Sequence, residues 1–332
     1  MSRFTSAALA ALAAGTLAAC SEPISPDTLL SDEPGALLAT GNVASDLPVL
    51  QSARSHRVEP VGFPADKFDV TVRFAVPVTE GQRAAFETAA ARWQGIINKD
   101  MPAVSGTIPA NACFPGMPAF SGTIDDILID VQLVEIDGPG KILGAAGACY
   151  IRTVDGLPVY GIMYFDVADL AFLESYDLLD ETIVHEMGHV IGLSGSFWNR
   201  FGLRSAAPDY RFLGKFGNLQ YGEAGGVGLL PIEDMYGAGT RGSHWREGVL
   251  KNELMTGFLN LGYNPLSRIT AGALRDMGYG TNMAAEDYTL PMLAAAASRE
   301  AADASQTALV DGIDLASSEL IHAPIGQIAE EQ

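Results

Sequence analysis

The chain has 332 residues, enough for one large domain or two modest ones. It carries 40 acidic against 20 basic side chains, which gives a formal net charge of −20 at pH 7. Such a surface repels phosphate backbones and anionic lipid headgroups, so the composition argues against nucleic-acid binding.

The N-terminus is typical of an export signal over residues 1–19. Arg3 supplies a positive charge, and the apolar stretch 4–19 is too short to span a bilayer comfortably. The stretch ends in Leu-Ala-Ala-Cys, which resembles a bacterial lipobox with Cys20 as the lipidated first residue. This predicts a protein exported and lipid-anchored to the bacterial cell envelope, at the outer membrane. The alternative is cleavage after Ala19 and a free secreted protein.

The next segment, residues 20–62, is rich in Ser, Pro, Asp and Ala without periodicity, and predicts a tether. Order begins with a strand over 68–76, whose apolar and polar residues alternate as in a half-buried strand. Thr79 and Gln82 then form a capping-box pattern. The apolar residues behind this pattern fall at helical spacing and predict an amphipathic helix. They are Phe86, Ala89, Ala90, Trp93, Ile96 and Ile97.

Two cysteines remain beyond the N-terminal segment, Cys113 and Cys149. An even pair in an exported chain predicts a disulfide, which would stabilise the fold by roughly 4 kcal/mol in the chain-entropy model. Two separate buried thiols are the alternative.

Strands are expected over 127–136 and over 159–166. The first contains few polar residues, which predicts a central position in the sheet. Asp180 is the expected N-cap of a following helix. The buried stripe of that helix contains Ile183, Val184, Met187, Val190 and Ile191.

Residues 193–243 are Gly-rich and are expected to be irregular. A later helix is predicted from near Ser267 to Gly278. Residues 283–332 form an acidic, Ala-rich tail, with one helix expected after Pro291 and no core of its own. The predicted fold class is α+β, a sheet with two long helices followed by a loop-rich half.

The segment HEMGHVIG, residues 185–192, carries the chemistry. His185 and His189 are four residues apart, so on a helix both imidazoles face one ion, on the side opposite the apolar stripe and toward a cleft. Glu186 is placed to reach a water on that ion. Zinc lowers the pKa of such a water toward 7, and a carboxylate takes its proton as it attacks a carbonyl.

A chance HExxH on a surface helix is the alternative, and two neighbours argue against it. Gly192 permits the left-handed turn that ends such a helix. A third ligand is available in His244, because His56 lies in the tether and His322 in the tail.

The pattern HExxHxxG followed by a distant His and then a Met resembles the metzincins, and the long insertion resembles leishmanolysin-like peptidases. The third His does not follow in the compact spacing, where Gly195 stands instead. The return segment 242–257 is similar to that of the leishmanolysin relatives. This resemblance makes His244 the third ligand and Met255 the structural methionine beneath the metal.

The likeness covers about residues 65–282. Residues 92–102 resemble the first helix of the family, and residues 264–282 resemble its closing helix. It implies a metzincin-like domain over 63–282, one catalytic Zn²⁺, protein or peptide substrates and metalloendopeptidase activity. With Cys20 assigned to the lipobox, no cysteine remains for a Cys-switch propeptide.

Three alternatives stay open. One is a metal-binding envelope or adhesion protein without catalysis, against which the intact Glu186 argues. Another is a carboxylate third ligand, Glu223 or Glu233. Strand 159–166 is either the sheet edge that pairs with substrate, by resemblance to metzincins, or a plain core strand. The sequence also leaves open whether calcium binds the aspartates Asp125, Asp126 and Asp130.

Overall fold

The computed structural model describes residues 49–50, 67–140, 142–237, 239–291, 312–314 and 319–328. Of residues 49–50, 312–314 and 319–320 only the backbone is described. The expected signal peptide, the lipidation site Cys20, most of the tether and the helix expected after Pro291 lie outside these ranges.

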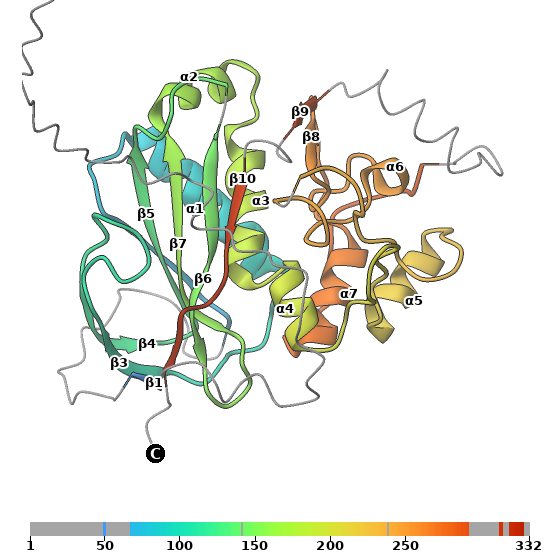
Figure 1. The fold of residues 1–332 in the computed structure, drawn as a ribbon, viewed down its shortest axis with the longest axis horizontal. Coiled ribbons are helices and arrows are strands. Elements are labelled where there is room, and N and C mark those ends of the chain that lie inside the picture. Colours follow the sequence, from blue (N-terminus) through green and yellow to red (C-terminus); the bar gives the residue numbers. More distant parts are fainter. Residues whose placement is uncertain are drawn as a thin grey trace, which may run out of the picture. The chain divides into compact units, whose positions relative to one another are not determined.

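The fold is built around a seven-stranded mixed sheet, formed mostly by the N-terminal half of the chain (Figure 1). Its order is β1-β11-β6-β7-β5-β2, with β10 also paired to β6. All its pairs are parallel except β6 with β7. The strands are β1 (Val49–Leu50), β2 (Val70–Phe74), β5 (Ile127–Val134), β6 (Gly144–Arg152), β7 (Pro158–Asp166), β10 (Glu319–His322) and β11 (Gly326–Ile328).

The predicted positions of two strands in the sheet are confirmed. Among the described strands β2 is half-buried and pairs only with β5, and β5 lies between β2 and β7 in the sheet interior. The idea that strand 159–166 is an open edge is wrong. β7 pairs with β5 on one side and with β6 on the other, so its backbone groups are already used.

Strand β6 was missed because five of its first six residues, GAAGAC, are Gly or Ala, and its only β-branched residue is Ile151 near the end. Its small residues allow close neighbours: a Cβ at Gly144 would lie 2.8 Å from the carbonyl oxygen of Tyr164. A small residue in a crowded strand therefore reflects packing across the sheet, which local propensity does not report.

Helices α1 (Glu80–Ile96) and α3 (Leu179–Ile191) pack on each other and on one face of the sheet. The capping box of α1 is confirmed, because the Gln82 amide donates to Thr79 Oγ1 and the Thr79 amide to Gln82 Oε1. The N-cap expected at Asp180 is wrong. Helix α3 begins two residues earlier than expected, with Leu178 as N-cap and no side-chain cap. A short helix α2 (Val167–Ser175) precedes it.

Alternate residues of the strands face a second, smaller core on the other side of the sheet. The antiparallel hairpin β3 (Val104–Ile108) and β4 (Phe120–Ile124) covers this side. Cys113 and Cys149 form a disulfide here, with their Cα atoms 6.0 Å apart.

Residues 193–291, named here the C-terminal region, are more ordered than expected. They contain the helices α4 (Gly195–Arg200), α5 (Lys215–Glu223) and α6 (Glu247–Leu250), the strand β8 (Phe258–Asn260) and the helix α7 (Arg268–Met277). The prediction for α7 is confirmed: Ser267 Oγ accepts from the Ile269 amide, and Gly278 ends the helix at φ +119°.

The tail contributes strands to the fold, which the sequence analysis did not anticipate. β9 (Gly312–Asp314) pairs antiparallel with β8, and both β10 and β11 extend the main sheet along β6. Ile328 on β11 is fully buried in the second core. In the described part of the chain, no helix combines the length and apolar character needed to cross a bilayer.

Candidate metal centre

Helix α3 carries His185, Glu186 and His189 into the protein interior. Each of these side chains is at most 1% exposed, and His244 of the C-terminal region is fully buried beside them. The expectation that one face of α3 opens on a cleft is therefore wrong. Every residue from Thr182 to Ile191 is buried, because the C-terminal region packs over the helix face that the sheet and α1 leave free.

The Nε2 atoms of three histidines meet at one point. His189 Nε2 lies 3.0 Å from the Nε2 atoms of both His185 and His244, and the latter two are 3.2 Å apart. Zn–N bonds of about 2.0–2.1 Å in a tetrahedral site place two ligand nitrogens ~3.3 Å apart. The three nitrogens thus have the separation that one small divalent cation requires, and they form a group able to hold a metal ion.

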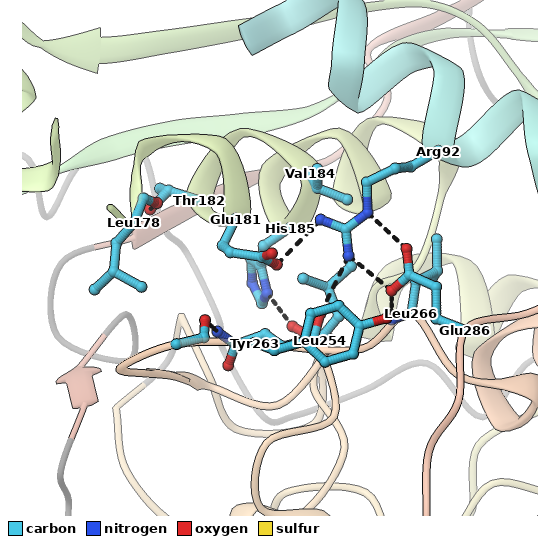
Figure 2. Close-up of polar contacts among 12 residues, drawn as sticks. Arg92, Leu178, Glu181, Thr182, Val184, His185, Leu254, Tyr263, Leu266 and Glu286 are labelled. Carbon is cyan, nitrogen blue, oxygen red and sulfur yellow. Dashed lines mark hydrogen bonds and ion pairs between the residues drawn. The ribbon is translucent and has the colours of Figure 1, made fainter. Parts of the chain in front are cut away.

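The other ring nitrogen of each histidine is held by the backbone. His185 Nδ1 donates to the Leu254 carbonyl at 2.7 Å, which Figure 2 shows, and His189 Nδ1 donates to the Leu193 carbonyl at 2.6 Å. His244 Nδ1 donates to the Thr240 carbonyl at 3.3 Å. A carbonyl only accepts, so each Nδ1 carries the proton and each Nε2 presents a lone pair to the common point. That chemistry fits a cation.

Gly192 explains how the end of α3 serves this arrangement. It ends the helix in the left-handed region at φ +109°, and the Leu193 amide then donates back to the Gly188 carbonyl at 2.9 Å. The reversal brings the Leu193 carbonyl to His189 Nδ1. The glycine therefore orients a candidate ligand as well as ending the helix.

Met255 packs on α3 beside the histidines. It is buried, and a Cβ at Gly188 would lie 2.7 Å from its Sδ atom and 2.9 Å from the Trp93 ring. The Met255 carbonyl accepts from the Trp245 amide, next to His244. A backbone hydrogen bond thus joins the segment that contains Met255 to the segment that contains His244.

Glu253 supports this turn, and sequence reasoning missed it. Its carboxylate, fully buried, accepts from the Met255 amide, from Ser267 Oγ and from Thr270 Oγ1. Burial raises the pKa of Glu253, and these hydrogen bonds oppose that rise. In the sequence this role is indicated only by the position of Glu253, an acidic residue two positions before Met255.

The two carboxylates considered as alternative third ligands lie outside the histidine group. Glu233 is buried, but its oxygens accept from the amides of Asp234, Met235 and Glu247. Glu223 is exposed at the end of α5.

Tyr164 on β7 lies close to Glu186. Burial raises the pKa of the Tyr164 hydroxyl to about 12, and the charge of Glu186 adds to the rise. Its ring stacks on Phe114 with centroids 3.9 Å apart, and its hydroxyl lies 3.1 Å from Nε2 of His322 in β10.

An ion-pair network fixes α3 against its neighbours (Figure 2). Arg92 of α1 makes a two-pronged contact with Glu286, at 2.8 Å on each prong, and reaches Glu181 of α3 at 3.1 Å. Glu286 also accepts from the Leu266 amide. One guanidinium thereby links α1, the first turn of α3 and the segment after α7.

The aspartates considered for calcium divide into two settings. Asp130 pairs with the Arg73 guanidinium and accepts from the Tyr160 hydroxyl. Asp125 and Asp126 instead group with Asp100, and burial raises the pKa of Asp126 to about 7.

Comparison with known proteins agrees with this geometry. The family model for leishmanolysin matches residues 218–297, a stretch that contains His244 and Met255. Leishmanolysin of Leishmania amazonensis is 25% identical over 233 residues, 64% of this chain and 36% of the relative. The leishmanolysin homolog of Crithidia fasciculata is 28% identical over 159 residues, 42% of this chain and 22% of the relative.

The chain thus spans between about a fifth and a little over a third of the length of these relatives. The mixed sheet and helices are consistent with a leishmanolysin-like fold. The bacterial lipoprotein form stays a prediction. The matched segment and the three converging histidines together make this chain similar to the leishmanolysins, which are zinc-dependent metallopeptidases.

Proposed function

We propose that this chain is a zinc metalloendopeptidase in which His185, His189 and His244 hold the metal and Glu186 is the general base. One observation carries the proposal. Three Nε2 lone pairs converge within 3.2 Å, each imidazole is oriented by a backbone carbonyl, and Glu186 stands next to His185 on the same helix.

The residues divide the work of peptide hydrolysis. Bound zinc would lower the pKa of a coordinated water to about 7 and polarise the scissile carbonyl. Glu186 accepts the proton of the attacking water and passes it to the leaving amine. The Leu254, Leu193 and Thr240 carbonyls hold the imidazoles in the tautomer that leaves Nε2 free for the metal.

Removal of the metal is the direct test. The purified protein is expected to cleave an unfolded protein substrate, to lose that activity in a zinc chelator, and to regain it when zinc is restored. A buffer control with a chelator already saturated by zinc separates metal removal from other effects of the reagent. Bound zinc without cleavage would contradict the proposal and favour a metal-binding envelope or adhesion protein.

We also propose that Cys20 carries a lipid anchor. The Leu-Ala-Ala-Cys ending of the N-terminal apolar stretch supports it. Cys20→Ser is expected to move the protein from the membrane to the soluble fraction, because the lipid would be its attachment. Ser21→Ala is the matched control and should stay with the membrane. Unchanged membrane association of Cys20→Ser would contradict the anchor.

A further inference from the structure

The last described residues of the chain pair with one strand of the C-terminal region and with one strand of the main sheet. β9 pairs with β8, which begins three residues after Met255, on the side of the C-terminal region. β10 pairs with β6, which packs against α3 from the sheet. Asp314 and Glu319 are five residues apart, so these two attachments lie at most about 18 Å from each other.

The segment is named here the strap and comprises residues 312–314 and 319–328. Figure 1 shows β10 lying along β6, the strand that packs against α3. In register, Glu319 to His322 of the strap lie beside Gly144 to Gly147 of β6, and β11 lies beside Tyr150 to Arg152. The strap therefore covers the outer edge of β6 over most of its length.

The contact between strap and sheet is close at Gly147. A Cβ at this position would lie 2.5 Å from the His322 carbonyl oxygen and 2.8 Å from its amide nitrogen. Only a residue without a Cβ lets the two backbones approach so closely. The edge of β6 is thus shaped for this segment of the same chain.

His322 of the strap contacts Tyr164 of β7, a residue of the second core. Its Nε2 atom lies 3.1 Å from the hydroxyl of Tyr164, and Tyr164 lies near enough to Glu186 to feel its charge. His185, Glu186, His189 and His244 are at most 1% exposed with the strap in place.

An extended peptide binds a sheet most simply by adding a strand to an open edge. The interior strands β5 and β7 are paired on both sides, and the strap occupies the outer edge of β6. A substrate that uses the edge next to α3 must first displace the strap.

We propose that the strap inhibits the enzyme by occupying the edge of β6, the strand that packs against α3, and that release of residues 312–314 and 319–328 opens this edge to substrate. This inference rests on the proposed peptidase function. The strap is covalently attached, so its effective concentration at the edge is on the order of millimolar, and modest intrinsic affinity suffices to keep it bound.

The test is controlled release of the strap from the folded protein. A recognition sequence for a site-specific protease is inserted between Pro291 and Gly312, and the protein is cut after folding and zinc loading. Gel filtration then shows whether the C-terminal fragment has left. Cleavage of an unfolded protein substrate is expected to rise by about tenfold or more on release, and a synthetic peptide of residues 312–328 should reverse the rise. The same insertion left uncut, and a cut protein that also carries Glu186→Gln, are the controls.

A pair of point variants gives a second measurement in the uncut chain. His322→Ala and Tyr164→Phe remove the same hydrogen bond from its two sides, so both should increase the rate if that contact holds the strap closed. These variants also test the proposal if the fragment stays bound after cutting. In that case, unchanged cleavage rates in both His322→Ala and Tyr164→Phe would overturn the proposal.

Two negative results have different meanings. Equal cleavage before and after release of the fragment would overturn the strap proposal and leave the peptidase function standing. No cleavage by either form, with zinc bound, would overturn the proposed function, and the strap proposal would fall with it.

Discussion

Glu186→Gln is expected to keep its zinc and to lose about 10²- to 10⁴-fold in the rate of peptide cleavage, the range typical of general-base catalysis. Glutamine keeps the size and shape of the side chain but has no basic carboxylate. The three imidazoles and the carbonyls that orient them are untouched by the change.

Asp180→Asn provides a matched control for this prediction. Asp180 is an acid on the same helix α3, but it is exposed and lies in the first turn, away from the histidine group. Both variants are compared with the parent chain for zinc content and for cleavage of an unfolded protein. Near-normal cleavage by Glu186→Gln would exclude Glu186 as the base.

His244→Ala is expected to abolish stoichiometric zinc binding. Three protein ligands with one open position define a catalytic zinc site, and two histidines alone bind the metal far more weakly. His244 is the proposed ligand from the C-terminal region, on a segment whose backbone is also hydrogen-bonded to Met255. We expect the fold to survive, because the sheet, α1 and α3 form their core without this side chain.

Elemental analysis of the purified variant checks this prediction, with circular dichroism as the measure of folding. His56→Ala, in the predicted tether, serves as the matched control and should retain one zinc per chain. Full zinc occupancy in His244→Ala would contradict the assignment and reopen the question of a carboxylate ligand such as Glu223 or Glu233.

Elements whose signals are local were predictable. The capping box of Thr79 and Gln82, the cap at Ser267 and the left-handed end at Gly278 depend on residues within one helical turn, and all three are present. Local signals also misled. Asp180 is a good N-cap residue, but Leu178 and Leu179 are buried and α3 begins there, since burial of apolar side chains outweighs a side-chain cap.

The pairing of strands that are far apart in the sequence was harder to predict. The sequence of β6 is rich in Gly and Ala and resembles a loop. The structure explains these small residues, because the backbones of Tyr164 on one side and His322 on the other lie too close for a larger residue. β10 and β11 lie in a segment of tail composition, and they form strands because β6 offers them an edge. A strand that exists through its partner leaves little trace in its own residues.

The sequence by itself determined which residues could carry the proposed chemistry: the helical spacing of His185 and His189, the adjacent Glu186 and the turn at Gly192 are properties of eight consecutive residues. Only the tertiary structure decided what surrounds them. The convergence of His244, the support from Glu253 and the pairing of the strap with β6 depend on backbone segments 55 to about 140 residues away from α3 in the chain. Side-chain type and spacing specify which atoms can bind a metal, whereas burial and access follow from packing between distant segments, which no local pattern encodes.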